Sequence, residues 1–430
     1  MRWLLISSQH HPSHGGIGTY VSRFVRGAIA SGWRVDLVTR PGELHPPGAR
    51  IHEITTPDVH DDFAARIPAL RQIERIRPYR YALWSRAVAE YLLTLNPEFE
   101  AIEFVDCQSE GYASLCSGRV RQHFRGVPMI VHAHTPMFVE EEINGCDQQR
   151  FGRTIYQHWE RAALEACDGI IVTSKLLRAR MPRSVAARVI PYPIERERIE
   201  ANVMRRDGLI VLVGSIQRRK GVDTWARSLN DVFAARRSAT AVMIGPDTST
   251  APDGGSMIEH VRRMIHPEHC SRFTWLGALP HEEALRIVAS ASMVVVPSVF
   301  ESFSFVAAEA LARQTPVLVS DRVGIAEHVA GLRTCPAGDA RAWRSAQSDM
   351  LADQTGSIQA AGTQRDRMFE ACSPQRHLQL RTEFLKSIQA ALPVRAKSST
   401  SVDAMDELTN FIEAVESEER SHSLCSSAGS

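Results

Sequence analysis

The most constraining feature of this chain is a rhythm of short apolar runs and helical patterns that starts again near its middle. In the first half the apolar runs predict five strands, at Trp3–Ser8, Arg34–Thr39, Ala101–Val105, Pro128–His132 and Gly169–Thr173. Helical patterns such as Tyr20–Ala30 and Tyr156–Ala166 lie between them. Continuous apolar strands that alternate with helices are typical of a parallel sheet covered on both faces. The first half therefore predicts a doubly wound α/β domain.

The rhythm is broken by Pro191-Tyr192-Pro193 and by a charged stretch from Glu195 to Asp207. A second series of apolar runs follows, at Leu209–Val213, Ala241–Ile244, Phe273–Leu276, Met293–Val296 and Val317–Val319. We therefore expect two Rossmann-like domains, at residues 1–192 and 208–372. A cleft between two such domains is a favoured place for a ligand.

Beyond residue 340 the pattern is helical to about Ala391, with a break expected at Ser373-Pro374 because proline interrupts helices. Residues 373–392 therefore predict one further helix. The tail, residues 393–430, is rich in Ser and acidic residues, so we expect it to be mostly disordered. The alternative is a short amphipathic helix, since four apolar residues have helical spacing: Met405, Leu408, Ile412 and Val415.

Composition narrows the class of protein. The 430 residues are 44% hydrophobic and 23% charged, which is ordinary for a soluble enzyme, and the net charge of +1 gives no argument for nucleic acid. Eight scattered cysteines without a C-x-x-C pair favour reduced thiols in the cytoplasm. No apolar run approaches the roughly 18–20 residues of a membrane span. The apolar start, Trp3–Ser8, is interpreted as a strand and not as a signal peptide.

Two glutamates eight residues apart, Glu301 and Glu309, lie where a predicted strand meets a predicted helix. The strand Met293–Val296 precedes Glu301, and the Ala-rich run Phe305–Arg313 predicts a helix that contains Glu309. Ligands bind at this edge of open α/β sheets. The free N–H groups of the helix start after Ser304 suit a phosphate, and a carboxylate accepts hydrogen bonds from sugar hydroxyls. The stretch predicts a nucleotide-sugar site; the alternative is a pair of solvated surface glutamates.

In this context the two glutamates, followed by the run Thr315–Asp321, resemble the donor-site signature of retaining glycosyltransferases of family 4. The resemblance covers about residues 1–390 and is most specific over 208–330. It implies the α/β GT-B fold, with two Rossmann-like domains facing across a cleft and a final helix, 373–392, that crosses back to the first domain. It also implies sugar transfer with retention of anomeric configuration, in polysaccharide or glycoconjugate biosynthesis.

The resemblance implies a UDP-, GDP- or ADP-linked sugar as donor and a lipid-linked or soluble glycan as acceptor. Glu309 would hold the ribose hydroxyls, and Glu301 would bond the transferred sugar. Lys220 would hold the diphosphate, together with Arg218 and the N–H groups of Phe303, Ser304 and Phe305. Such a clamp stabilises the charge that develops on the leaving group, so no metal cofactor is expected.

On the first domain, the glycine-rich run His14–Tyr20 follows the first predicted strand, and Gly16 resembles part of the family's loop that faces the donor phosphates. The alternative is a tight strand-to-helix turn. His134 resembles the family's active-site histidine, with His132 as second choice; the alternative is a hydrogen-bonded histidine at a strand end. His132 and His134 point to one face of a strand, which is the reason to consider a metal site. A metal site that includes His10, His11 or His14 is disfavoured, because no carboxylate or cysteine stands at ligand-like spacing.

The chain departs from the family pattern at several positions. Ser215 stands where an arginine is usual, so Arg218 is expected to replace it and Arg219 competes for that role. An alternative for this basic run is a solvated turn. There are four further departures. Ser304 and Gln314 each stand where the family usually has glycine. Gly324-Ile325-Ala326-Glu327 replaces a Gly-Gly pair before a glutamate, and Tyr192-Pro193 replaces Asn-Gly. These departures indicate a divergent subgroup.

A basic and aromatic segment in the first domain contains Tyr79, Tyr81 and Trp84 among six arginines: Arg66, Arg71, Arg75, Arg77, Arg80 and Arg86. Such a surface can lie on anionic lipid at the inner membrane face. The alternative is a solvated arginine-rich helix face, and no RNA-binding motif is present.

Three rivals to the transferase hypothesis remain open. A nucleotide-sugar epimerase of the GT-B fold would share the architecture, and a synthase of the sucrose-phosphate type would use a soluble acceptor. A degenerate, non-catalytic assembly partner would bind a nucleotide-sugar without turnover.

Overall fold

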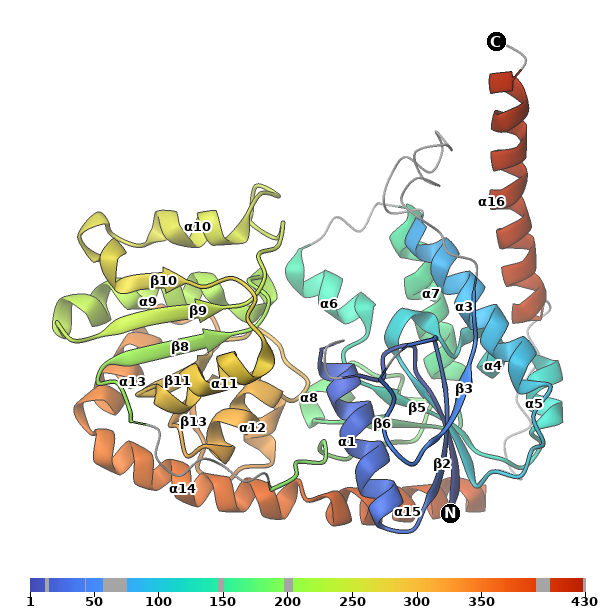
Figure 1. Cartoon of the computed structure of the whole chain (residues 1–430), viewed down its shortest axis with the longest axis horizontal. Helices are drawn as coiled ribbons and strands as arrows, with labels where there is room; N and C mark the ends of the chain where they lie inside the picture. The colour runs from blue at the N-terminus through green and yellow to red at the C-terminus, as the bar shows by residue number, and fades with distance from the viewer. Residues whose placement is uncertain are drawn as a thin grey trace.

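The computed structural model describes residues 1–11, 15–42, 44–56, 76–145, 151–196, 204–391 and 403–427. Two parallel sheets organise these residues, with strand orders β3-β2-β1-β4-β5-β6-β7 and β10-β9-β8-β11-β12-β13 (Figure 1). The first sheet comprises β1 (Arg2–Ile6), β2 (Arg34–Thr39), β3 (Arg50–Glu53), β4 (Ala101–Val105), β5 (Met129–Ala133), β6 (Gly169–Val172) and β7 (Ala187–Val189). The second comprises β8 (Leu209–Val213), β9 (Thr240–Ile244), β10 (Phe273–Trp275), β11 (Met293–Val296), β12 (Val317–Ser320) and β13 (Arg333–Cys335).

Helices connect the strands. Those of the first half are α1 (Gly16–Ala30), α3 (Ile76–Leu92), η3 (Cys107–Ser109), α4 (Tyr112–Cys116), α5 (Gly118–His123), α6 (Met137–Asn144), α7 (Phe151–Ala166) and α8 (Lys175–Arg178). Those of the second half are η4 (Arg218–Lys220), α9 (Val222–Ala235), α10 (Met257–Met264), η5 (Pro267–Arg272), α11 (His281–Ser290), α12 (Phe305–Ala312), η6 (Gly324–Glu327), α13 (Ala340–Ala352), α14 (Gln354–Ala371), α15 (Pro374–Ala391) and α16 (Ala404–Ser427).

Strand β1 illustrates why both faces of the first sheet are covered. Trp3 and Leu5 pack into a core that includes α1 and α15, whereas Leu4 and Ile6 pack into a second core. Successive side chains of a strand point to opposite faces, so a strand that is apolar at every position requires a helical layer on each side. The predicted doubly wound architecture is therefore confirmed.

Helix α15 lies against the first domain although it follows the second in sequence. Helix α14 ends at Ala371 and α15 begins at Pro374, where the sequence analysis places a break. The two helices run along the lower edge of the molecule in Figure 1. Phe384 and Ile388 of α15 share a core with Trp3 and Ile171 of the first sheet. The chain therefore crosses back from the second domain to the first.

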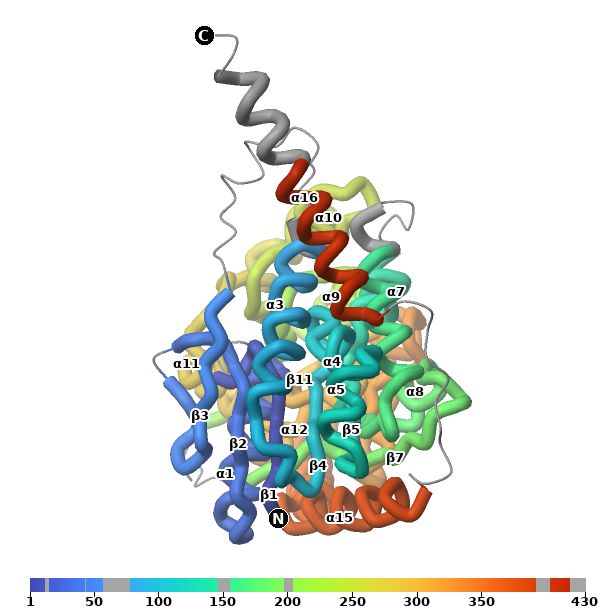
Figure 2. Tube along the Cα trace, turned by 90° about the vertical axis from the view of Figure 1, so that its right-hand side faces the viewer, coloured from blue at the N-terminus to red at the C-terminus, as the bar shows by residue number. Residues whose placement is uncertain are grey.

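The C-terminal segment differs from the expectation of a mostly disordered tail. Residues 404–427 form α16, which lies beside α3 (Figures 1 and 2). Met405, Leu408 and Ile412 are buried in a core with Phe124 and Trp159 of the first domain. The amphipathic helix therefore replaces the disordered tail, because these apolar residues find a hydrophobic surface to cover.

The same contact corrects the interpretation of the basic and aromatic segment. Tyr79, Tyr81 and Trp84 are buried in the core that α16 helps to form, and the Tyr79 hydroxyl donates to Glu416 at 3.2 Å. These three aromatic rings therefore do not form a membrane-facing surface. Arg66, Arg71 and Arg75 lie outside the described residues. Within the described parts of the chain, no helix combines the length and apolar character that crossing a membrane requires.

The docking of α16 predicts a stability effect. Leu408→Ala should lower the free energy of unfolding by about 3 kcal/mol, because a fully buried leucine is replaced by a cavity. The measurement is urea denaturation of the purified chain. Glu413→Ala, on the exposed side of the same helix, is the matched control and should change the value by less than about 0.5 kcal/mol. Equal effects of the two substitutions would contradict the docked position.

Candidate active site

An ion pair between Lys220 and Glu301 lies at the carboxyl edge of the second sheet. Lys220 ends η4, which follows β8, and Glu301 follows the end of β11. The Lys220 Nζ atom lies 2.9 Å from Glu301 Oε1, and Ser298 Oγ donates to Glu301 Oε2 at 2.8 Å. Gly214, directly after β8, has a φ angle of 138°, a backbone conformation that favours glycine. The predicted residues of this edge are therefore brought together by two neighbouring strands.

Burial acts on both members of this pair. Desolvation raises the pKa of the Glu301 carboxyl, but the Lys220 and Arg219 charges outweigh it and leave that pKa below its usual value. Desolvation also lowers the pKa of Lys220, against the opposing effect of Glu301. Each side chain therefore stays charged because its partner is charged, as expected for a pair with little access to water.

The two candidate arginines of η4 lie in different environments. Arg219 is buried, donates from Nη1 to the Phe300 carbonyl at 3.0 Å, and lies 3.6 Å from Glu140 of the first domain. Arg218 is exposed, and its Nη1 atom would be 3.0 Å from a β-carbon at Gly145. Of the two, Arg219 is the arginine whose charge lowers the pKa of Glu301.

The N-terminus of α12 adjoins this ion pair along the chain. Ser304 caps the helix, with Oγ accepting from the Ala307 N–H at 3.3 Å, and its φ angle is 109°. Such a φ favours glycine, because a β-carbon crowds the backbone there. Phe303 is buried below the helix start, and Phe305 is partly exposed. The structure thus gives a physical reason for the glycine that the family usually has at this position.

Glu309 of α12 faces the first domain. Its Oε1 atom lies 3.6 Å from Arg23 Nη2 of α1 and 3.6 Å from His281 Nε2 at the start of α11. The Arg23 guanidinium also lies over the Phe305 ring, 5.0 Å from its centroid. The carboxylate predicted to bind ribose is therefore placed where α1, α11 and α12 meet.

His134 approaches the same place from the end of β5. Its ring Nδ1 bonds to the Tyr192 hydroxyl, and its backbone N–H donates to Asp106 Oδ2 at 2.9 Å. Tyr192 stacks on Phe305 of the second domain, with ring centroids 4.8 Å apart and planes 5° apart. Burial lowers the pKa of His134 well below its usual value, and the neighbouring His132 adds to the effect. The imidazole is therefore neutral at pH 7.

Gly16 also adjoins the second domain. A β-carbon at Gly16 would lie 3.8 Å from Phe305 Cδ2, so this glycine is next to the α12 terminus. His14 of the same loop lies outside the described residues.

Two family models match this chain, one for each half. The model described as "Glycosyl transferase 4-like domain" matches residues 15–193, and the model described as "Glycosyl transferases group 1" matches residues 207–353. The chain belongs to glycosyltransferase family 4.

Curated relatives match parts of the chain. It is 29% identical over 244 residues to alpha-maltose-1-phosphate synthase of Mycolicibacterium smegmatis, which covers 51% of the chain and 60% of that protein. It is 29% identical over 189 residues to D-inositol 3-phosphate glycosyltransferase of Corynebacterium jeikeium, covering 42% of the chain and 44% of that protein. The chain thus spans about half the length of these two relatives.

Solved structures match over most of the chain. Sucrose-phosphate synthase from Thermosynechococcus elongatus gives a TM-score of 0.67 at 22% identity, covering 91% of the chain and 99% of that structure. HepE from Anabaena, solved with UDP and glucose, gives a TM-score of 0.62 at 14% identity, covering 90% and 100%. These likenesses confirm the predicted GT-B fold of the chain.

Two other histidines that the sequence analysis considered, His132 and His10, have structural partners. His132 contacts Arg381 Nη2 at 2.9 Å, and its ring stacks on His134 with centroids 4.5 Å apart. His10 bonds to Thr39 Oγ1 at 2.7 Å and stacks on His45. Among the described residues, no group of three or more His, Cys, Asp or Glu side chains is arranged as metal ligands.

The sequence did not predict the hydrogen bonds that join the two domains. Thr135 donates from Oγ1 to Ser302 Oγ at 3.1 Å, beside both His134 and Glu301 in the chain. Asn144 Oδ1 accepts from the Arg219 N–H at 2.9 Å, and Asn144 Nδ2 donates to Gln217 Oε1 at 3.0 Å. No local pattern marks these residues, because each partner is more than 70 positions away.

The Lys220–Glu301 pair predicts a coupled stability effect. Lys220→Met should lower the free energy of unfolding by about 3 kcal/mol, because it leaves a largely buried carboxylate without its cation. Adding Glu301→Gln should restore about half of the loss, since the uncompensated charge is then gone. Chemical denaturation of the two single variants and the double variant measures the coupling. Strictly additive losses would contradict a direct ion pair.

The backbone at Ser304 makes a second prediction. Ser304→Ala loses the cap and keeps the β-carbon, whereas Ser304→Gly loses the cap and relieves the backbone. The glycine variant should therefore be more stable than the alanine variant by about 2 kcal/mol, as measured by thermal unfolding. At an ordinary capping position the difference would be a few tenths of a kcal/mol to about 1 kcal/mol, so a value in that range would argue against strain.

Proposed function

We propose that this chain transfers a sugar from a nucleotide-diphosphate-sugar to an acceptor hydroxyl with retention of anomeric configuration. The observation that carries the proposal is the Lys220–Glu301 ion pair beside the N-terminus of α12, opposite His134. Phosphates bind at helix N-termini that have a nearby cation. A carboxylate next to such a cation can bond the hydroxyls of the attached sugar.

Each residue has a distinct role in the proposed reaction. Lys220 and the α12 terminus bind the diphosphate and stabilise the charge on the leaving group, so the reaction uses no metal cofactor. Arg219, whose charge already reaches Glu301, supports this site in place of the exposed Arg218. Glu301 forms hydrogen bonds with the transferred sugar. Glu309 binds the ribose hydroxyls after Arg23 and His281 move away from part of its carboxylate.

His134 supplies the opposing wall. In the proposed tautomer Nδ1 accepts from the Tyr192 hydroxyl, so the neutral imidazole carries its proton on Nε2. Within the described residues, Nε2 is buried without a hydrogen-bond partner. That N–H is suited to donate to a hydroxyl of the transferred sugar. Gly16 leaves room beside Phe305 for the donor to pass.

For the acceptor we propose a chemical class and not a single compound. Two relatives are named for phosphate-bearing sugars, maltose 1-phosphate and inositol 3-phosphate. We propose a glycan or a sugar phosphate as acceptor, in glycoconjugate or polysaccharide biosynthesis. An epimerase of the same fold would consume the nucleotide-sugar with no acceptor present, and a degenerate partner would bind it without turnover.

Thermal-shift measurements with UDP, GDP and ADP test donor binding. The correct nucleotide should raise the unfolding temperature, since a ligand at 100 times its Kd stabilises by about 2.7 kcal/mol.

Lys220→Ala and Glu309→Ala should each weaken binding of that nucleotide by about 1–3 kcal/mol in calorimetry. Lys386→Ala, an exposed lysine on α15, is the control and should bind normally. Unchanged affinity in both site variants would overturn the assignment. Once donor and acceptor are found, the anomeric signal of the product in NMR tests retention.

A further inference from the structure

Two buried carboxylates hold the segment that carries His134. Asp106, at the end of β4, accepts the His134 N–H through Oδ2 at 2.9 Å. Glu160, on α7, accepts the Met137 and Phe138 N–H groups at 3.0 and 3.1 Å, through one oxygen each. Helix α6 begins at Met137 and has no other side-chain cap. Residues 134–138 are therefore held at one end by Asp106 and at the other by Glu160.

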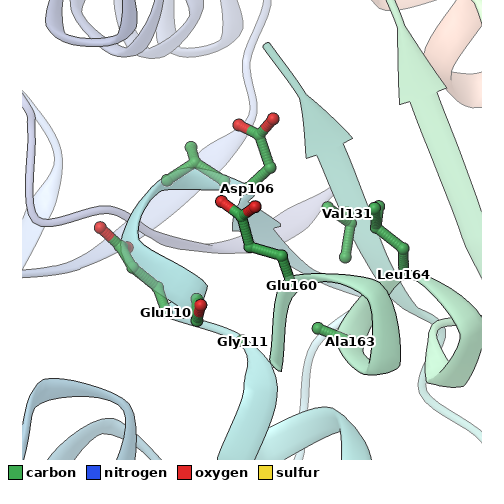
Figure 3. A pocket seen from close by; sticks show the side chains of 9 residues that line it. Asp106, Glu110, Gly111, Val131, Glu160, Ala163 and Leu164 are labelled. Atoms are coloured by element: carbon green, nitrogen blue, oxygen red, sulfur yellow. The ribbon is translucent and has the colours of Figure 1, made fainter. Parts of the chain in front are cut away.

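Both carboxylates line one small cavity behind this segment (Figure 3). The cavity has a volume of about 10 Å³, near the lower limit for a single water molecule. In Figure 3 the Glu160 side chain extends toward Asp106, whereas the Glu110 carboxylate points away from both. Among the described residues that line the cavity there are three carboxylic acids and no basic side chain. Two ionised carboxylates in such a place repel each other, and no cation in the lining offsets the cost.

We propose that Asp106 and Glu160 share one proton, held on Asp106 Oδ1, and that this proton makes them positioning residues for His134. The location follows from the bonding of each oxygen. Both Glu160 oxygens already accept N–H groups at a helix N-terminus, which favours the ionised form. Asp106 Oδ1 is buried without a hydrogen-bond partner among the described residues. A proton on that oxygen can donate toward Glu160, directly or through one water.

The neighbouring groups are consistent with this placement. Those that face the pair are Cys107 and Glu110 from the η3 region, Glu141 from α6, His134 from the end of β5 and Tyr192 from the segment that follows β7. None is a fixed cation. Burial raises the pKa of Asp106 to about 7, against the backbone N–H groups that lower it, and burial raises the pKa of Glu160 well above its usual value.

The sign of the pH dependence follows. Folding raises the pKa of Asp106 from its unfolded value, near 4, to about 7. The stability that the bound proton contributes is complete below the unfolded pKa and is lost as the pH rises through about 7. Asp106→Asn has the shape of the protonated acid at every pH. Its unfolding temperature relative to wild type should therefore rise between pH 5 and pH 8. Infrared spectra of the wild type at pH 6 should contain a protonated carboxyl stretch that is weaker in Asp106→Asn, because the Glu110 carboxyl, whose pKa burial raises to about 7, still contributes there.

Glu160→Gln is the discriminating variant. An amide can accept only one of the two N–H groups, so this variant should unfold at a lower temperature at every pH. Hydrogen exchange at Met137 or Phe138 should be accelerated severalfold, whereas Asp106→Asn should keep the exchange of His134 at the wild-type rate. Asp168→Asn, which removes a buried carboxylate paired with Arg121 at 2.6 Å, is the control and should not reproduce the rise with pH.

Two results would overturn the proposal. A pH-independent difference between Asp106→Asn and wild type would show that no proton is released from the pair. A tolerated Glu160→Gln together with a disrupted Asp106→Asn would place the proton on Glu160. The importance of His134 rests on the proposed function, but these measurements need no ligand. Failure of UDP, GDP and ADP to bind would defeat the proposed function and leave the shared proton standing.

Discussion

A fully buried ion pair between Glu103 of β4 and Arg381 of α15 joins the two ends of the fold. Burial disfavours the Glu103 charge, but Arg381 and His132 hold the pKa of that carboxyl well below its usual range. Tyr20 and Trp3 also donate to Glu103, at 2.7 and 2.9 Å. Such a pair adds little net stability when intact but is costly to break, because either charge alone would be buried without compensation. It therefore fixes where α15 can lie.

The position of α15 has consequences for the site. His377 of α15 bonds to the Pro191 carbonyl at 2.7 Å, one residue before Tyr192, and Arg381 contacts His132, two residues before His134. The helix that crosses back thus supports both members of the His134–Tyr192 pair from behind. Asp106 and Glu160 hold the same segment from the other side. The first-domain segment that carries His134 is therefore bonded from both α15 and α7.

The sequence predicts the central strands well and the edges poorly. All ten predicted strands are present, because most positions in each are apolar. The three missed strands, β3, β7 and β13, lie at edges of their sheets and have exposed or partly exposed positions, so they lack such runs. Motifs likewise located Glu301, Lys220 and His134, since each follows a strand. The Arg23–Glu309 and Asp106–Glu160 pairs depend on packing between distant segments, which no local pattern encodes.

The departures from the family pattern have a shared physical basis. Ser304 and Gln314 stand where the family usually has glycine, and both have positive φ angles, 109° and 56°. The backbone has therefore kept a shape suited to glycine while the side chains changed. At Ser304 the hydroxyl offsets part of the strain, because it caps the helix whose terminus faces the proposed diphosphate. The substitution therefore changes the side-chain chemistry next to the proposed diphosphate site while the backbone geometry is retained.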